Sequence, residues 1–177
     1  MDKIQSDTNS LNWAASFIKN RSRQAEETFR INGLVRRYKD DMPAITAHWD
    51  VSEDSVRFNE IPEGVEDDRI TVFECGMEGF WAGLFDPSVY EADTLWTTGH
   101  WDNKIAKVIE AWEKRQKLSP VFLIRYGDEG DLAFVSDGKH RLTVARAIRA
   151  ASVPFMVGMN DVAWAEETFP SARKLSS

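Results

Sequence analysis

The order of apolar runs between residues 121 and 158 limits the fold of this chain more than any other feature. Two short runs rich in branched and aromatic residues, VFLIRY at Val121–Tyr126 and LAFV at Leu132–Val135, flank a Gly/Asp turn and predict a β-hairpin. The charged run SDGKHRL follows at Ser136–Leu142, then a helical pattern, then a third apolar run at Val153–Gly158. A helix between two strands predicts a domain that mixes α and β structure.

Residues 102–117 give the clearest helix, with charged residues on one face and apolar residues at spacings of three and four on the other, namely Ile105, Val108, Ile109 and Trp112. Residues 69–75 (RITVFEC) are rich in branched and aromatic residues and predict a strand. Residues 76–86 (GMEGFWAGLFD) hold three glycines among aromatic residues, and two interpretations stay open: a loop over a pocket, or a strand with bulges. The pair Asp86-Pro87 predicts the start of another helix, and residues 160–169 predict a last short one.

The length of 177 residues fits one domain with an appendage. Residues 11–39 read as helical, with Asn32-Gly33 as a point where the helix breaks in two, so we assign residues 1–40 to a helical N-terminal extension and residues 41–177 to the domain. The extension is basic, with 8 Lys or Arg against 5 Asp or Glu, whereas residues 41–100 hold 2 against 14. The net charge of −7 therefore still permits a basic face for nucleic acid at the N-terminus, and it equally permits an acidic surface for a basic partner.

The small numbers of cysteines and histidines limit which disulfides, metal sites and nucleophiles the chain can contain. A single cysteine, Cys75, allows no disulfide within the chain, which favours a reducing cytoplasm. One cysteine and three histidines argue against a structural zinc site, and Cys75 has no evident histidine to pair with as a nucleophile. The polar first ten residues do not resemble a signal peptide, and no apolar run reaches the length of a membrane span. We expect a cytoplasmic protein with no membrane span.

The run SDGKHRL has the composition of a phosphate-binding turn. The free N–H groups and the dipole of a helix N-terminus attract anions, and Gly138 would let a phosphate approach the backbone. Lys139, His140 and Arg141 surround that position with donors, and an arginine can hold two phosphate oxygens at once. Three roles stay open for Asp137: it caps the helix, orients His140, or holds a divalent cation that bridges phosphates.

The helix after this turn is expected to run to about residue 151. Its apolar face would hold Val144, Ala147, Ile148 and Ala151. The basic residues Lys139, Arg146 and Arg149 would face solvent, and Leu142 does not fit this division. The alternative to a ligand site is a plain surface turn, since Asp-Gly is a common turn pair and charged residues are common at helix starts.

The run FVSDGKHRLTVARAIRAASVPFMV resembles the ParB/sulfiredoxin-like superfamily, in which a strand leads into a D-G-x-H-R turn, a helix and a strand introduced by proline. The order LFDPSVYEAD, WTTGHWDNKIAKVIEAW, SPVFLIRY and SDGKHRL is similar, more closely, to plasmid fertility-inhibition factors of the Osa and FiwA type. The resemblance covers about residues 80–158. It departs from the fertility factors in Lys139, where they favour arginine, and from sulfiredoxins in lacking a cysteine inside the turn.

The resemblance implies a ParB/sulfiredoxin-like α/β (mixed α+β) fold, with a small, partly parallel sheet flanked by helices. It implies binding of ATP or another nucleotide, or of DNA phosphodiester, and ATPase and DNase activity that blocks conjugative DNA transfer through a type IV secretion system. The expected catalytic residues are Asp137, His140 and Arg141. The expected phosphate ligands are Gly138, Lys139 and Arg141, joined by His100 and Lys104 from the glycine-containing stretch. A divalent cation, Mg²⁺ in the first place, is expected, with Asp137 as its candidate ligand.

Further residues and functions stay as alternatives. Asn103 lies beside Lys104 as a further possible ligand, and Glu74, Glu78 and Asp86 are acids that would help Asp137 hold a metal. The partners implied for a fertility factor are DNA, nucleotide, and the conjugative coupling protein or relaxosome components in a bacterial host. The first alternative function is a non-catalytic inhibitor, with a phosphate-binding turn and an acidic surface over residues 50–68 that mimics DNA. The second is a DNA-binding regulator that contacts phosphates through the basic N-terminal helices.

Overall fold

A computed structural model describes residues 2–52, 70–91, 93, 95–97, 101–126 and 132–176. The chain divides into two compact units, residues 1–42 and residues 43–177, and each is described by itself. The acidic stretch of residues 50–68 from residue 53 onward, the expected Gly/Asp turn at 127–131 and His100 lie outside the described residues.

The first unit is one helix, α1 (Asp2–Asp40). The helix expected over residues 11–39 is confirmed, and the expected break at Asn32-Gly33 is wrong, because the helix continues through both residues. An interior glycine costs about 1 kcal/mol relative to alanine, which a long helix tolerates. The basic side chains that precede and follow this pair are exposed, namely Arg21, Arg23, Arg30, Arg36, Arg37 and Lys39.

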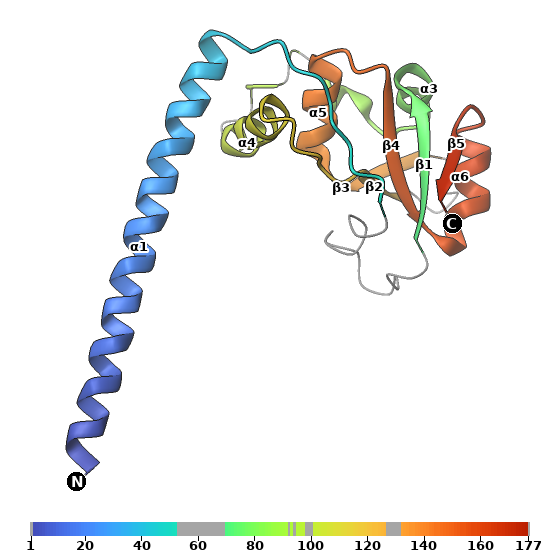
Figure 1. Ribbon diagram of the computed structural model, residues 1–177. Coiled ribbons are helices and arrows are strands. Elements are labelled where there is room, and N and C mark those ends of the chain that lie inside the picture. The colour runs from blue at the N-terminus through green and yellow to red at the C-terminus, as the bar shows by residue number, and fades with distance from the viewer. Residues whose placement is uncertain are drawn as a thin grey trace. The chain divides into compact units, whose positions relative to one another are not determined.

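A five-stranded mixed sheet in the order β3-β2-β4-β1-β5 forms the centre of the second unit (Figure 1). Its strands are β1 (Ile70–Gly76), β2 (Val121–Tyr126), β3 (Leu132–Asp137), β4 (Ser152–Gly158) and β5 (Arg173–Ser176). β2 and β4 are parallel, and the three other pairings are antiparallel, so the expected hairpin, the partly parallel sheet and the mixed α/β class are confirmed. β5 is a strand that the sequence did not predict.

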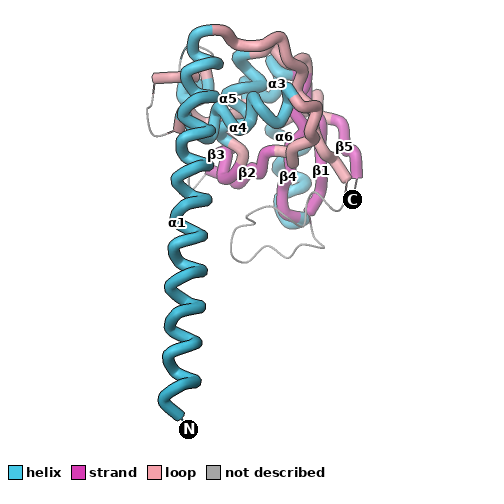
Figure 2. Tube along the Cα trace, turned by 60° about the vertical axis from the view of Figure 1, so that its left-hand side comes forward, coloured by secondary structure: helices cyan, strands magenta, loops and turns pink. Residues whose placement is uncertain are grey.

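Helices precede and follow the β2–β3 hairpin along the chain, and β4, β1 and β5 lie side by side (Figure 2). The α-helices of this unit are α3 (Met77–Ala82), α4 (Asp102–Glu113), α5 (Lys139–Ala147) and α6 (Val162–Thr168). Two short 3₁₀ helices, η2 (Pro87–Tyr90) and η4 (Met159–Asp161), complete the described elements. The expected helices over 102–117, after Asp86-Pro87 and over 160–169 are confirmed, although α4 ends at Glu113. Among the described residues, no helix is both long and apolar enough to cross a membrane.

Stacked phenylalanines hold the helices on one face of the sheet. Phe73 of β1 and Phe155 of β4 stack with ring centroids 5.3 Å apart, and Phe80 of α3 stacks on Phe169 at 5.5 Å. Phe169 also lies 4.9 Å from Phe155, and all four side chains are fully buried. The other face carries a smaller buried cluster around Phe122, at the centre of the sheet.

Residues 77–82 form the helix α3, so both interpretations of the glycine-rich stretch, a loop and a bulged strand, are wrong. The packing explains the helix. Phe80 reaches the phenylalanine stack from the buried side of α3. Gly83 ends the helix where the ring of Phe169 leaves no space for a Cβ atom. The glycines that look like loop residues in the sequence therefore let a short helix lie close to its neighbours.

The helix α5 ends at Ala147, four residues earlier than expected. Its last turn closes with a bond from the Ala150 N–H to the Ala145 carbonyl and one from the Arg149 N–H to the Arg146 carbonyl, the pattern of a Schellman motif. Arg149 has a φ of 55°, in the left-handed region where glycine is usual. Leu142 is fully buried and belongs to the face of α5 that packs into the unit, contrary to the expected division.

Candidate functional site

The turn between β3 and α5 depends on Gly138. β3 ends at Asp137, Gly138 takes a φ of 90°, and α5 begins at Lys139. A Cβ atom at Gly138 would lie 2.9 Å from Val121 Cγ1 and 3.0 Å from Val121 Cα, both too close. Packing against β2 and the left-handed backbone therefore account for this glycine without a bound phosphate.

Asp137 holds Arg141. The Arg141 Nη2 donates to Asp137 Oδ2 at 2.8 Å and lies 3.3 Å from the Pro120 carbonyl oxygen, which it also contacts as a donor. The Arg141 side chain is 18% exposed and the Asp137 side chain 32%, so the pair is partly shielded from water. No side chain caps α5, because Gly138 is its N-cap residue, so Asp137 does not serve as the helix cap.

His140 is partly buried in the first turn of α5. Burial first, then the positive charges of Lys104 and Arg141, and least that of Lys139, together lower its pKa to about 4, while the charge of Asp137 acts in the opposite direction. The neutral imidazole is therefore favoured at neutral pH. The Trp101 ring packs edge-on against the imidazole with centroids 4.8 Å apart. His140 Nε2 is buried and has no hydrogen-bond partner among the residues that the structure describes.

The first turns of α4 and α5 lie next to each other at this point. Trp101 is the N-cap residue of α4 and contacts His140 in the first turn of α5, and Lys104 is close enough to depress the His140 pKa. The partial positive charge of two helix N-termini therefore adds to the charges of Lys104, Lys139 and Arg141. Lys104 is exposed, as is Asn103, for which no contact with the turn is seen.

Lys139 points away from this group. Its Nζ lies 4.4 Å above the centroid of the Phe134 ring on β3, a cation–π contact. Its carbonyl oxygen accepts a bond from the Thr143 hydroxyl at 2.9 Å, inside α5. The turn thus divides its cations, with Arg141 and Lys104 near His140 and Lys139 over an aromatic ring.

The acids that the sequence offered as metal ligands have other partners. Glu74 accepts bonds from Arg173 at 2.9 Å and Ser152 at 2.8 Å, and Asp86 accepts one from Ser88. Glu78 pairs with an arginine at the far end of α5. Within the described ranges, no group of three or more His, Cys, Asp or Glu side chains is arranged to hold a metal ion. Asp137, already paired with Arg141, is the one described carboxylate of the turn, so these residues do not build a divalent-cation site of their own.

Cys75 is buried, and its Sγ lies 3.4 Å from the Ser171 hydroxyl. No histidine contact with it is seen among the described residues, which fits the interpretation as a small buried side chain.

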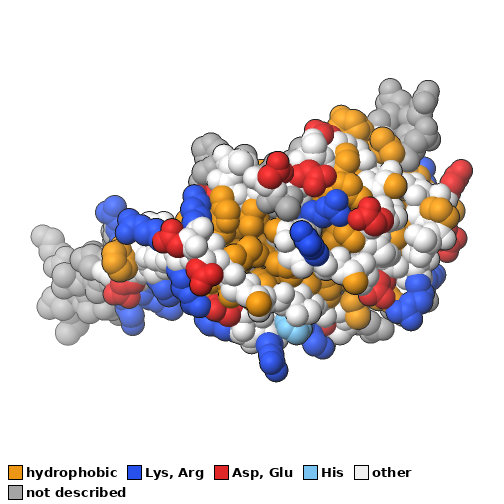
Figure 3. All heavy atoms as spheres, turned by 90° about the horizontal axis from the view of Figure 1, so that it is seen from above, with side chains coloured by type: hydrophobic (Ala, Val, Ile, Leu, Met, Phe, Trp, Pro, Cys, Tyr) orange, Lys and Arg blue, Asp and Glu red, His pale blue; other side chains and the backbone are white. Residues whose placement is uncertain are grey.

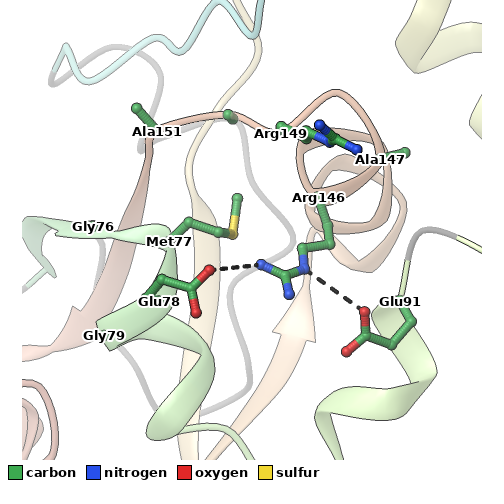
Figure 4. Close-up of a pocket in the computed structure, with 10 residues that line it drawn as sticks. Gly76, Met77, Glu78, Gly79, Glu91, Arg146, Ala147, Arg149 and Ala151 are labelled. Atoms are coloured by element: carbon green, nitrogen blue, oxygen red, sulfur yellow. Dashed lines mark hydrogen bonds and ion pairs between the residues drawn. The ribbon is translucent and has the colours of Figure 1, made fainter.

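A hollow of about 700 Å³ lies at the other end of α5, and the sequence did not indicate it. Figure 4 shows Arg146 between two carboxylates, with Arg146 Nη1 3.4 Å from Glu78 Oε1 and Arg146 Nε 3.7 Å from Glu91 Oε2. The Arg146 guanidinium also lies 4.6 Å above the Trp81 ring, whose Nε1 donates to Glu91 at 3.1 Å. These residues come from three separate segments, so no local sequence pattern marks the hollow.

A second hollow of about 370 Å³ shares Arg149, Ala150 and Ala151 with the first and is otherwise lined mainly by residues 45–49 and Ile148. In Figure 3, exposed apolar side chains lie among charged side chains of both signs. Arg146 is paired with two carboxylates in the larger hollow, whereas at the β3–α5 turn Asp137 pairs with Arg141 and Lys104 is exposed.

Comparisons with protein-family models, with curated proteins and with solved structures find no match for this chain.

Proposed function

We propose that the chain binds a phosphate group, carried by a nucleotide or by DNA, at the turn between β3 and α5. The observation that carries the proposal is the meeting of the first turns of α4 and α5, with Lys104 and Arg141 around His140. A phosphate there would accept bonds from Arg141 and Lys104 and from free N–H groups at the start of α5.

The electrostatic argument uses His140 as a probe. Apart from burial, the charges of Lys104, Arg141 and Lys139 disfavour a proton on the imidazole. A positive field that repels a proton attracts an anion at the same place. Asp137 opposes this field but also fixes the Arg141 guanidinium by a 2.8 Å bond, which reduces the entropy that Arg141 loses when it holds a ligand.

The activity proposed for this site is the attack of water on the bound phosphorus, which cleaves the phosphoanhydride of a nucleotide or the phosphodiester of DNA. Arg141 would stabilise charge on the phosphoryl oxygens, His140 would accept or donate a proton, and Asp137 would orient Arg141. A histidine with a pKa of about 4 is a weak base, and its Nε2 is buried. The geometry therefore supports binding more directly than turnover, and a binding protein without catalysis is the second candidate.

The biological role rests on the resemblance to fertility-inhibition factors. The strand–turn–helix–strand order of β3, α5 and β4, with β4 parallel to β2, agrees with a ParB/sulfiredoxin-like fold. The proposed role is to block conjugative DNA transfer by acting on DNA or nucleotide, with the coupling protein or the relaxosome as partner. A DNA-binding regulator is the third candidate, because the basic side chains of α1 are exposed.

The test is binding and hydrolysis of ATP and of labelled DNA by the full chain and by the variant Lys104→Ala. Lys104 is exposed, so its removal leaves the core intact. An exposed charge contributes about 0.5–1 kcal/mol, so we expect binding about two- to fivefold weaker. Lys174→Ala is the matched control, because Lys174 is exposed on β5, at the opposite edge of the sheet from β3.

Equal binding by the Lys104→Ala variant, the Lys174→Ala control and the unchanged chain overturns the phosphate site. The DNA-binding regulator is favoured instead if the affinity for duplex DNA falls steeply with salt and is unchanged by Lys104→Ala and by Arg141→Ala. The phosphate contacts would then come from α1. Binding without release of phosphate or cleavage of DNA favours the non-catalytic candidate.

A further inference from the structure

Three aromatic rings form a continuous run on the β2–β3 hairpin, from the Tyr126–Leu132 pair at the start of β3 to Phe134, which lies nearer the β3–α5 turn. Phe85 stacks on Tyr126 with centroids 3.7 Å apart and planes inclined by 19°. Tyr126 in turn lies 6.0 Å from Phe134 with an inclination of 30°. Tyr126 is 43% exposed, and neighbouring Leu132 is 39% exposed. Tyr126 and Leu132 are thus two neighbouring exposed apolar side chains beside the partly buried rings of Phe85 and Phe134, and together they form an apolar surface that a partner can contact.

The fold brings these rings together from three segments. Tyr126 pairs with Leu132, and Ile124 with Phe134, across the β2–β3 hairpin, so Tyr126 and Phe134 share one face of the sheet. The Phe85 N–H donates to the Ala133 carbonyl at 2.8 Å, which fixes Phe85 at the edge of β3. The spacing of the run is thus set by backbone pairing.

The run leads directly to the cationic turn. The Lys139 Nζ lies 4.4 Å above the Phe134 ring, and Lys139 is the first residue of α5. The aromatic surface is therefore joined at one end by the amine of Lys139, while Arg141 and Lys104 form a separate cationic group near His140. Aromatic rings beside a cation form the pattern that binds bases and phosphates together.

We propose that Phe85, Tyr126 and Phe134 form a stacking surface for the bases of single-stranded nucleic acid, whose phosphates lie at Lys139 and the β3–α5 turn. The proposal rests on the proposed phosphate site and names its ligand class. Single strands are favoured over duplex, because only unpaired bases expose their ring faces to an aromatic side chain.

Charge favours nucleic acid over a basic peptide as the occupant. Lys139 already lies on the Phe134 ring, and a basic peptide would also meet the field of Arg141 and Lys104. The phosphates are therefore expected toward the Lys139 amine, with the bases toward Tyr126 and Phe85.

The first measurement is fluorescence anisotropy with a 5′-fluorescein dT12 oligonucleotide and the full chain. We expect Tyr126→Leu to weaken binding about 5- to 100-fold, the effect of losing one base–aromatic stack. Tyr126→Phe keeps the ring and should bind within about twofold of the unchanged chain. Phe29→Leu is the matched control, because Phe29 is an aromatic residue of α1 that is 83% exposed, and its replacement should leave binding unchanged.

A second measurement does not depend on how the variants fold. Oligonucleotides with 5-iododeoxyuridine are irradiated on the unchanged chain, and the cross-linked residue is located by mass spectrometry. Cross-links at Tyr126, Phe134 or Phe85 support the stacking surface. Cross-links confined to residues outside it overturn the proposal.

The outcomes separate this proposal from the phosphate site. If Lys104→Ala weakens binding of ATP and dT12 while Tyr126→Leu does not, the stacking surface is wrong and the phosphate site stands. If Tyr126→Leu weakens dT12 binding while Lys104→Ala changes nothing, the stacking surface stands and the phosphate site fails. The stacking surface is overturned if duplex DNA binds as tightly as dT12. It is also overturned if the chain binds an oligolysine peptide and Tyr126→Leu abolishes that binding.

Discussion

The protonation of His140 gives a prediction whose size follows from the structure. Its pKa is lowered to about 4, against 6.5 for an unperturbed histidine, chiefly by burial and then by Lys104, Arg141 and Lys139. In the unfolded chain His140 takes up a proton as the pH falls below 6.5, whereas the folded protein takes it up only near pH 4. The stability that His140 contributes is therefore complete above pH 6.5 and is lost between pH 6.5 and about 4.

Because His140 is only partly buried, solvent screens its charge, and a shift of this size corresponds to about 1–2 kcal/mol instead of the full 1.36 kcal/mol per pKa unit. Urea unfolding at pH 7 and at pH 4 measures the loss of stability. We expect the loss in the unchanged chain to exceed that of His140→Gln by about 1–2 kcal/mol, because glutamine does not titrate. An equal loss in both proteins refutes the account of a buried, unprotonated imidazole.

Nuclear magnetic resonance follows the same group directly. The imidazole signal of His140, assigned by its absence in His140→Gln, should titrate near pH 4 without ligand. A bound phosphate places negative charge beside the ring and should raise this pKa, and by linkage phosphate should bind more tightly as His140 is protonated. A titration midpoint at pH 6.5 refutes the burial of the ring. A midpoint that does not change when phosphate is added shows that the anion binds elsewhere.

Three further predictions concern stability, each measured by urea unfolding at pH 7. Gly138→Ala should lower the unfolding free energy by about 2 kcal/mol or more, because the new Cβ meets the Val121 backbone at 3.0 Å with φ at 90°; an unchanged value contradicts the packing described for the turn. Arg115→Gly should raise it by up to about 1 kcal/mol, since Arg115 holds a φ of 58° at the end of α4, and a fall would show that the arginine side chain stabilises more than the strain costs. Phe80→Ala should lower it by about 3–5 kcal/mol, because the ring is fully buried in the phenylalanine stack, and a loss under 1 kcal/mol would contradict that packing.

The sequence predicts best the helices and strands whose own residues show an apolar run or a regular apolar spacing. β2, β4 and α4 have apolar runs or apolar spacings that match their burial in the structure. β5 has the sequence RKLS, without such a pattern, and is a strand only because β1 provides the backbone partners. α3 was missed for a related reason. Gly83 is explained by the ring of Phe169, 86 positions later in the sequence, and Gly79 by the side chain of Ser171, 92 positions later.

The sequence predicted which residues form the candidate site, but it did not predict which of these side chains contact one another. Asp137 and Arg141 are four residues apart across a helix start, a spacing that permits their contact, yet the roles considered for Asp137 involved the helix cap, His140 and a metal. The burial of His140 depends on Trp101 from another helix, and no pattern around residue 140 indicates it. The aromatic run on the β2–β3 hairpin depends on the register of that hairpin and on a backbone bond from Phe85, which a linear sequence does not display.

The position of β1 in the sheet determines when the domain completes its fold. β1 lies between β4 and β5, so both of its partner strands begin at residue 152 or later. As the chain leaves the ribosome, residues 70–76 emerge first and have no backbone partner until about eighty further residues have been made. The β2–β3 hairpin closes locally in the meantime, and pairing of β4 with both β2 and β1 then joins the two halves of the sheet. A nascent chain stopped before β4 would therefore carry an apolar strand with two open edges, the state in which chaperone capture and aggregation compete with folding.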